Sequence, residues 1–255
     1  MMDMSDYDEI AAFYDIEHAH FDEDVDMYLN YAGLSAGTIL ELACGSGRLL
    51  LPLAEAGYEM TGVDSSAQML GLAEQRLRQA GMLSRCALVQ QDMCALHLQQ
   101  KFHMAFVALG SFAHLITRKQ QQQALRGIRD ALVRGGQFIL DISNADARYM
   151  ENLSGQVLYQ GTWQRDDGAF VSHFASPASS NRQRLLELTH FYDVYEQGGV
   201  MRRTISKTQL YLFERGEMEL LLEQAGFVVK EVYGDFHLGA FEIDSPRMIF
   251  LTEAR

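Results

Sequence analysis

The sequence predicts an α/β protein in which a seven-stranded, mostly parallel sheet carries a small antiparallel β sheet as an insertion. Two patterns support this class. Up to about residue 141, short apolar runs alternate with stretches of helical periodicity, which is typical of a parallel sheet covered by helices on both faces. From about residue 157 to 211, apolar and polar residues alternate and Thr, Tyr, Phe and Val are frequent, which indicates antiparallel strands with one solvated face.

Seven runs are apolar enough to be buried strands. Five precede the alternating segment and two follow it: Thr38–Leu42, Met60–Val63, Ala87–Val89, Met104–Leu109, Gln137–Leu140, Phe227–Val232 and Met248–Leu251. The predicted helices are one or two within Tyr7–Tyr31, Arg48–Ala56, one capped by Ser65 or Ser66 that runs to Ala80, Arg118–Val133 and Glu214–Ala225.

The alternating segment sets the predicted domain boundaries. Residues 1–150 and 212–255 are expected to form the core, and residues 151–211 a substrate-cap insertion. Two histidines, His173 and His190, fall in this insertion. Because histidines of half-solvated strands most often face water, we expect both at the surface.

Acidic residues gather near the start of the chain. The formal net charge is −13, and 11 of the 34 acidic residues precede Arg48, the first lysine or arginine. Since a long double-stranded nucleic acid needs a basic stripe for its phosphates, this class of partner is disfavoured. The acidic stretch has two interpretations, a source of solubility or a lid whose field favours a cationic ligand.

The sequence predicts neither export nor membrane insertion. No apolar run approaches the ~18–20 residues that span a bilayer. Residues 1–9 are acidic, unlike the basic start of a secretory signal. The three cysteines, Cys44, Cys86 and Cys94, are odd in number and lack the spacing of a disulfide framework. We therefore expect a protein of the reducing cytoplasm without structural disulfides.

The segment Thr38–Arg48 carries the most informative motif, a buried strand followed by a turn with Gly45 and Gly47 and the start of a helix. Glycines allow the sharp turn and the close approach of a ligand, and the helix N-terminus offers unpaired N–H groups. Leu50 stands where the dinucleotide fingerprint needs its third glycine, so a pyrophosphate loop is disfavoured. Glu41, at the carboxyl end of the strand, would repel a phosphate but could hold a cation or an amine.

Carboxylates follow three successive predicted strands: Glu41, Asp64 and Asp92. The carboxyl ends of parallel strands lie at one edge of the sheet, where such sheets bind ligands. Asp64, 17 residues after Gly47, has the position of an acid that accepts both hydroxyl protons of a ribose. Asp92 is placed to take an adenine amino group. The pattern predicts an adenosine ligand, and the simpler interpretation is that all three acids only cap turns.

These motifs resemble those of the class I S-adenosylmethionine-dependent methyltransferases. The resemblance covers the chain from Tyr7 to Asp141 well and the part after Glu214 more loosely. It rests on Glu41–Gly47, Gly62–Asp64 with Met69–Leu70 following, Gln91–Met93 and Gly135–Gly136. It implies a Rossmann-like methyltransferase sheet of strand order 3-2-1-4-5-7-6, in which only the last strand is antiparallel.

The resemblance also implies the residues that bind the cofactor S-adenosyl-L-methionine. Ala43, Gly45 and Gly47 would cradle its amino acid part, and Asp64 would bind its ribose. The other implied residues would contact the adenine, flank the sulfonium, lie near the carboxylate or complete the site: Asp92 and Met93; Leu109, Gly110 and Ser111; Tyr14; Glu41, Ser65 and Met69.

The methyl acceptor is predicted to be a small molecule. Family members that modify DNA bases or protein amides often carry an N-P-P-Y-type motif after the fourth strand, and this chain has a different sequence at Leu109–Leu115. The antiparallel insertion resembles the cap of bacterial small-molecule methyltransferases, which excludes water and builds an acceptor pocket. We expect in-line transfer to a nitrogen or an oxygen, with His114 as the candidate general base.

Further expectations concern metals, partners and competing functions. No metal is expected, because His18 and His20 are two residues apart and would not share a helix face. We expect a monomer or a homodimer without a nucleic-acid or membrane partner. Two alternatives stay open. One is a nicotinamide-dependent oxidoreductase, which Leu50 and Glu41 disfavour, and the other is a non-catalytic protein that binds S-adenosylmethionine.

Overall fold

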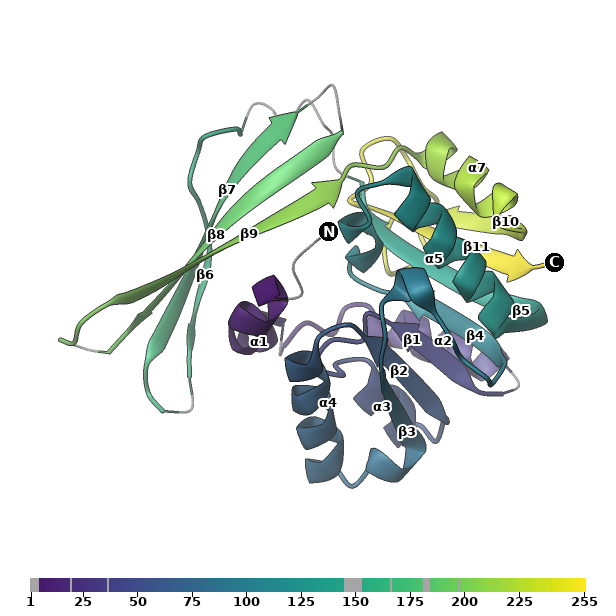
Figure 1. Ribbon diagram of the computed structural model, residues 1–255, viewed down its shortest axis with the longest axis horizontal. Coiled ribbons are helices and arrows are strands. Elements are labelled where there is room, and N and C mark those ends of the chain that lie inside the picture. The colour runs from purple at the N-terminus through teal and green to yellow at the C-terminus, as the bar shows by residue number, and fades with distance from the viewer. Residues whose placement is uncertain are drawn as a thin grey trace. The chain divides into compact units, whose positions relative to one another are not determined.

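The computed structural model describes residues 5–18, 20–35, 37–144, 153–165, 167–180, 184–196 and 198–255. The chain divides into two compact units, whose elements are labelled in Figure 1. The larger unit comprises Asp22–Asn144 and Phe213–Arg255, and the smaller unit comprises the described residues of Met1–Phe21 and Ala145–Leu212. The predicted boundaries placed the first helix in the core, whereas in the structure it groups with the inserted segment.

The larger unit is built on a seven-stranded sheet of order β10-β11-β5-β4-β1-β2-β3 (Figure 1). Its strands are β1 Ile39–Leu42, β2 Met60–Asp64, β3 Cys86–Gln90, β4 Phe102–Val107, β5 Leu132–Ser143, β10 Phe227–Tyr233 and β11 Arg247–Ala254. Strand β11 is antiparallel to β5 and β10, whereas the pairs from β5 through β3 are parallel. The predicted fold class and strand order are confirmed.

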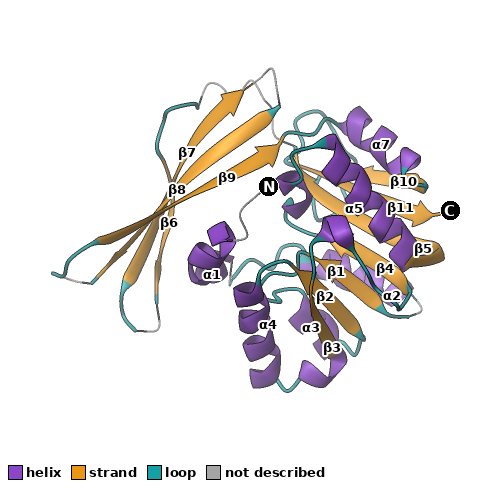
Figure 2. Cartoon of the chain, viewed as in Figure 1, coloured by secondary structure: helices purple, strands orange, loops and turns teal. Residues whose placement is uncertain are grey.

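Helices and short 3-10 turns precede the first strand of this sheet and follow the later ones (Figure 2). They are α2 Val25–Leu34, α3 Leu50–Glu55, α4 Ala67–Gln79, η1 Leu83–Arg85, η2 Met93–Ala95, η3 Ser111–His114, α5 Arg118–Ala131 and α7 Arg215–Gln224. All four residues of β1 are buried, so both faces of the sheet are covered at its centre. This burial explains why the parallel strands appear in the sequence as continuous apolar runs.

Side-chain caps fix where two helices begin. The Ser66 hydroxyl accepts a hydrogen bond from the Met69 N–H, so Ser66 rather than Ser65 is the N-cap of α4. Thr117 and Gln120 form a reciprocal capping box at the start of α5. Both caps are local, and both lie at the sequence positions where the helical periodicity begins.

Strand β5 begins earlier than predicted. Gln137 was the expected first residue, but β5 starts at Leu132, which pairs with Phe102 of β4. Gly135 has a φ of 77°, and the register of β5 against β4 shifts between Phe102 and Met104. The first residues of β5 are irregular and include a glycine with positive φ, so their sequence does not have the pattern of a strand. The apolar run that predicts the strand begins only after this glycine.

Aromatic rings fill the core of the larger unit. The ring of Tyr28 on α2 lies 4.5 Å from that of Phe106 on β4, measured between centroids. Phe138 of β5 and Phe227 of β10 are 5.1 Å apart in the same way. These four side chains are fully buried, so they hold α2 and the β10 edge to the sheet.

The smaller unit is a four-stranded antiparallel sheet of order β6-β7-β8-β9 with α1, Ser5–His18, packed on one face. The strands are β6 Leu158–Gln164, β7 Phe170–Ser180, β8 Leu185–Tyr195 and β9 Arg202–Tyr211. Ile10 of α1 packs on Val171 and Tyr192, and the ring of Phe13 stacks on Tyr192 at 4.8 Å.

Among the residues that the structure describes, none of the helices has the length and apolar character required to cross a membrane.

Candidate active site

The loop after β1 turns sharply at three residues with positive φ: Ala43 at 53°, Gly45 at 53° and Gly47 at 77°. The left-handed conformation costs a residue with a Cβ about 1–2 kcal/mol, so the surroundings hold Ala43 in it. A Cβ on Gly47 would lie 3.1 Å from the Cβ of Ala73 on α4. Glycine at this position therefore serves both the turn and the packing of α4 against the loop.

Asp64, the last residue of β2, ties this loop to the neighbouring strand. Its Oδ2 accepts a hydrogen bond from the backbone N–H of Gly45 at 2.8 Å, and its Oδ1 accepts one from Ser66 at 2.9 Å. A carboxylate offers about four lone-pair sites, so two backbone bonds do not exhaust it as an acceptor. Nearby, Ser65 is exposed, whereas Met69 is buried on α4 facing Gly45.

Glu41 of β1 is buried, with 4% of its surface exposed. Its Oε2 accepts no hydrogen bond from the part of the chain that the structure describes. Burial raises the pKa of Glu41 well above its usual value, and the positive charge of Arg48 offsets this only in part. An acceptor left without a donor in the interior is costly, so a ligand donor such as an ammonium group fits this point.

Arg48, at the end of the glycine loop, forms a bidentate ion pair with Asp24. Its Nη1 and Nη2 donate to the two carboxylate oxygens at 2.6 Å each, and the Asp24 side chain is fully buried. Neither interpretation of the acidic N-terminal stretch included this pair. One of those acids is therefore a structural partner of the loop.

The end of β3 lies beside the end of β2, because the Gln91 N–H donates to the Asp64 carbonyl at 3.0 Å. Asp92 follows and is exposed, and it caps η2 by accepting a hydrogen bond from the Cys94 N–H at 2.8 Å. Met93, in η2, is half-buried. Burial and the Asp92 carboxylate raise the pKa of the Cys94 thiol to about 12. Asp92 thus caps a turn, and it does so at the same sheet edge as Asp64.

The turn after β4 is held by the neighbouring strand β5. Leu109 has a φ of 49° and Gly110 one of 75°. The Leu109 N–H donates to the Asp141 Oδ2 at 2.8 Å, and the Gly110 N–H donates to the Asp141 carbonyl at 3.1 Å. Ser111 starts η3, and its hydroxyl donates to the Ala108 carbonyl at 2.9 Å. Asp141 therefore fixes a left-handed turn that includes a residue with a Cβ.

Arg247 of β11 supplies the counter-charge of Asp141. Its Nε and Nη2 both donate to the carboxylate, the latter at 2.8 Å, and its guanidinium lies 5.0 Å from the ring centroid of Phe236. Burial raises the pKa of Asp141, while Arg247 and the Leu109 N–H act in the opposite direction.

Two further predicted site residues are His114, which lies in the 3-10 turn η3, and Tyr14, which lies in helix α1. His114 ends η3 and is half-buried, directly after the turn that Asp141 holds. Tyr14 belongs to the smaller unit, where its ring stacks on His18 of the same helix at 4.0 Å. The roles given to both residues stay predictions.

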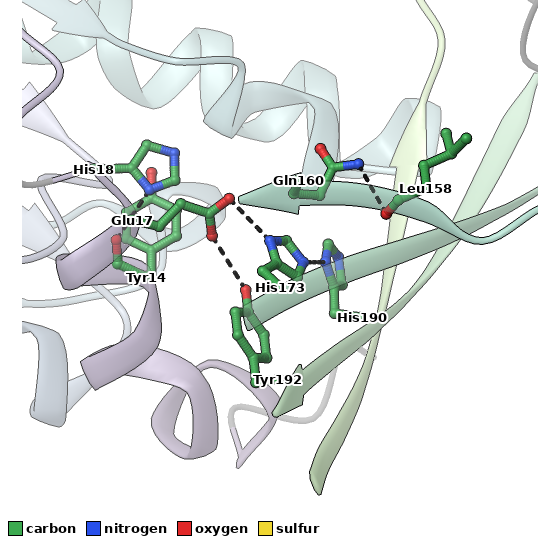
Figure 3. A network of polar contacts seen from close by, with 8 residues as sticks. All are labelled: Tyr14, Glu17, His18, Leu158, Gln160, His173, His190 and Tyr192. Atoms are coloured by element: carbon green, nitrogen blue, oxygen red, sulfur yellow. Dashed lines mark hydrogen bonds and ion pairs between the residues drawn. The ribbon is translucent and has the colours of Figure 1, made fainter. Parts of the chain in front are cut away.

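The expectation that both histidines lie at the surface is wrong for His173. It holds only in part for His190, which keeps part of its surface exposed. His173 is buried, with 4% exposed, and His190 is half-buried. Figure 3 shows both in one chain of polar contacts: His173 Nδ1 lies 2.9 Å from Glu17 Oε1, and His173 Nε2 lies 3.0 Å from His190 Nδ1. The Tyr192 hydroxyl donates to Glu17 Oε2 at 3.5 Å.

The side chains of this hydrogen-bonded network change one another's pKa values. Burial opposes ionisation of Glu17, but the hydrogen bond from His173 and the three nearby histidines His173, His18 and His190 together outweigh it, so the pKa of Glu17 is lowered. Burial, with His173 adding to it, lowers the pKa of His190 to about 4. Burial and the Glu17 carboxylate raise the pKa of Tyr192. At neutral pH Glu17 is therefore ionised and His190 is neutral.

The sequence contained a signal for one part of this hydrogen-bonded network. Register pairs His173 with Tyr192 across β7 and β8, and Val171 lies two residues away on the same face. The alternation could therefore have indicated that His173 faces the packed side. Its partner Glu17 is 156 residues away, and no local pattern connects the two.

The chain is similar in sequence and in fold to known methyltransferases. Residues 39–136 match the family described as Methyltransferase domain. A putative methyltransferase of Bacillus subtilis, YqeM, is 25% identical over 251 residues, which cover 97% of this chain and 96% of that protein.

Two solved structures share the fold. An S-adenosylmethionine-dependent methyltransferase from Clostridium acetobutylicum has a TM-score of 0.78 at 21% identity, with 97% of this chain and 98% of that chain covered. The sugar N-methyltransferase KedS8 from Streptoalloteichus has a TM-score of 0.76 at 21% identity, with 96% and 92% covered.

Proposed function

We propose that this chain is a class I S-adenosylmethionine-dependent methyltransferase, which moves the methyl group of its cofactor onto a nitrogen or oxygen of a small molecule. We further propose that the acceptor atom is an amine nitrogen. The observation that carries the proposal is the Asp64 carboxylate bound to the Gly45 N–H at the carboxyl edge of the sheet. Support for nitrogen comes from the solved sugar N-methyltransferase with the same fold.

The residues at this edge fit S-adenosyl-L-methionine. The Asp64 carboxylate, oriented by two backbone N–H groups, would accept the hydroxyl protons of the ribose. Glu41, whose buried Oε2 accepts no hydrogen bond from the described residues, would take the ammonium group of the cofactor's amino acid part. Ala43, Gly45 and Gly47 would form the backbone cradle around that part.

The remaining predicted contacts belong to the ends of β3 and β4. Asp92 and Met93 would hold the adenine, beside the strand end that carries Asp64. Leu109, Gly110 and Ser111 would flank the sulfonium. The bond from the Leu109 N–H to Asp141 keeps this turn in one conformation before the cofactor binds. Ser65 and Met69 complete the proposed site in the larger unit.

When bound, S-adenosyl-L-methionine supplies a methyl group already activated by a sulfonium. The chain itself then contributes alignment and exclusion of water. Holding two partners in a reactive orientation is worth about 7–11 kcal/mol of the barrier. The strained turns at Ala43 and Leu109 fix the backbone in the unliganded protein, so little ordering remains to be done on binding. An acceptor that keeps a proton also needs a base, and His114 remains the candidate in the larger unit.

We assign the acceptor-binding role to the smaller unit, with residues 151–211 as its cap and α1 as part of it. Helix α1 and the sheet face on which it packs bring aromatic, histidine and carboxylate side chains together, which suits a polar small molecule better than a purely apolar one. We also propose a cytoplasmic location and a monomer or homodimer. Support for a reducing compartment comes from Cys44, Cys86 and Cys94, which are all free thiols.

Titration calorimetry with S-adenosylhomocysteine tests the cofactor site. We expect Asp64→Ala to weaken binding more than tenfold and Glu219→Gln, on the surface of α7, to leave it unchanged. NAD and NADP serve as the competing ligands and should not bind. An unchanged dissociation constant in Asp64→Ala would contradict the assignment of Asp64, and tight binding of NAD would favour the oxidoreductase alternative.

A further inference from the structure

Glu41 of the larger unit lies in a group of charged side chains in which carboxylates outnumber cations. Asp24, the residue before α2, and Asp64, at the end of β2, both act on Glu41 electrostatically, and Arg48 is the cation that acts on it. Both terminal nitrogens of the Arg48 guanidinium donate to the Asp24 carboxylate, at 2.6 Å each. The charge of Arg48 is therefore committed to Asp24, and Glu41 has no ion-pair partner of its own among the described residues.

The other titratable side chains around Glu41 supply no positive charge. They are Tyr28 of α2, Cys44 of the glycine loop and Cys86 of β3, each of which interacts electrostatically with Glu41. Burial raises the pKa of all three, so they are neutral at neutral pH. Glu41 itself is buried, and its Oε2 receives no hydrogen bond from the part of the chain that the structure describes.

The carboxyl group of Glu41 can be stabilised in this environment in two ways. An ionised carboxyl in the interior without a counter-charge is unstable and takes up a proton, which removes the charge and adds an O–H donor. An ammonium group brings both an opposite charge and N–H donors, so it makes the proton unnecessary. A proton and an ammonium group therefore exclude each other as partners of this one carboxyl group.

We propose that Glu41 carries a proton in the unliganded protein and loses it when the ammonium group of the cofactor binds, so that binding releases one proton. This inference rests on the proposed function and deepens it, because it states how pH regulates the same site. Burial, which raises the pKa of Glu41, supports it; Arg48 opposes the rise, and Asp24 and Asp64 add to it.

The exchange balances in atoms and in charge. The O–H bond of the Glu41 carboxyl group breaks, its electron pair stays on oxygen, and the proton passes to water or buffer. The ammonium group keeps its own protons and donates one N–H to the carboxylate. The site loses one positive charge with the proton and gains one with the ammonium group, so the buried group of side chains keeps the same total charge.

Titration calorimetry in two buffers with different enthalpies of ionisation counts the protons released per bound ligand. S-adenosylhomocysteine carries the amino acid part of the cofactor, whereas methylthioadenosine has the same adenosine and thioether but lacks that part. At about pH 6 we expect the wild type to release close to one proton with S-adenosylhomocysteine and none with methylthioadenosine. Affinity for S-adenosylhomocysteine should then rise by up to about tenfold per pH unit in this range, because binding is linked to one proton.

Glu41→Gln tests the same group directly. The amide has nearly the shape of a protonated carboxyl group and cannot ionise, so the unliganded variant loses no charge and should keep Tm within about 2 °C of wild type. We expect it to release no proton with S-adenosylhomocysteine and to bind it more weakly, by a factor that grows as the pH rises. Glu55→Gln, which changes an exposed carboxylate of α3, is the matched control and should release the proton as wild type does.

Infrared difference spectroscopy of the wild type needs no variant. The C=O stretch of a protonated carboxyl group should be present in the free protein and disappear when S-adenosylhomocysteine binds. Binding without proton release and without loss of this band would overturn the proton on Glu41 and leave the proposed function standing. Equal proton release by wild type and Glu41→Gln would assign the proton to another group and overturn the inference as well. A wild type that binds neither ligand would overturn the proposed cofactor site itself.

Discussion

Replacing Asp141 by Asn removes the charge that holds the turn after β4. The Asp141 side chain is fully buried, it accepts the Leu109 N–H, and it forms two hydrogen bonds with Arg247. The substitution keeps the shape of the side chain, but it places an amide N–H against either Leu109 or Arg247, both of which are donors. Arg247, whose side chain is 17% exposed, is left without a counter-charge.

Breaking a buried ion pair on one side costs about 3–5 kcal/mol. Because Arg247 keeps some access to water, we take the lower end, about 3 kcal/mol. For a chain of this size, each kcal/mol shifts Tm by about 2–4 °C, so we expect Asp141→Asn to lower Tm by about 6–12 °C. The exposed pair Arg215–Glu219 on α7 supplies the control, since Glu219→Gln should cost only about 0.3–0.5 kcal/mol.

A substitution at Leu109 tests whether Asp141 positions the turn for cofactor binding or only stabilises the fold. Glycine adopts the left-handed conformation freely, so Leu109→Gly removes the strain that Asp141 holds in place. The double-mutant cycle consists of the wild type, Asp141→Asn, Leu109→Gly and the double variant. Thermal denaturation and titration with S-adenosylhomocysteine of these four proteins measure the coupling between the two residues. We expect Asp141→Asn to weaken binding less in the Leu109→Gly variant than in the protein that keeps Leu109. Equal losses in both backgrounds, or a Tm within about 2 °C of wild type for Asp141→Asn, would refute the reasoning.

Three further predictions follow from local geometry. Gly47→Ala forces a Cβ into a φ of 77° and to 3.1 Å from Ala73, so binding of S-adenosylhomocysteine and Tm should both fall, and an unchanged titration would contradict the account of the loop. Ser66→Ala removes the N-cap of α4 and should lower the free energy of unfolding, measured in urea, by about 1 kcal/mol. Ser65→Ala is the control and should leave this free energy unchanged. The pKa of His190 is lowered to about 4 in the folded protein, so the unfolded chain binds more protons between about pH 6.5 and 4 and stability should fall as the pH falls through that window. Urea unfolding of His190→Gln should show a weaker fall than wild type, and identical pH profiles would contradict the burial of that imidazole.

Local patterns predicted the larger sheet well. The buried strands of a doubly covered sheet appear as short apolar runs because both faces exclude water, as the buried residues of β1 illustrate. Ser66 and Thr117 marked helix starts because capping is a local interaction. The start of β5 at Leu132 was missed because an irregular segment with Gly135 interrupts the strand pattern.

Long-range pairs were not predictable from the sequence. Asp141 and Arg247 are 106 residues apart, and Glu17 and His173 are 156 apart, so neither pair leaves a periodic signal. Asp24 looked like one acid among many until its bond to Arg48 was known. The glycine loop and Asp64 were found because a turn that needs positive φ and a strand that ends in an acid are both visible locally.

Transfer of a labelled methyl group tests the central claim most directly. The full chain is incubated with S-adenosyl-L-methionine labelled on the methyl carbon and with a panel of amino sugars, amino acids, phenols and alcohols. We predict that label passes to nitrogen in at least one amine and that S-adenosylhomocysteine appears in equal amount. Label found only on oxygen would contradict the choice of nitrogen, and no transfer to any acceptor by a protein that binds the cofactor would contradict the enzymatic function itself.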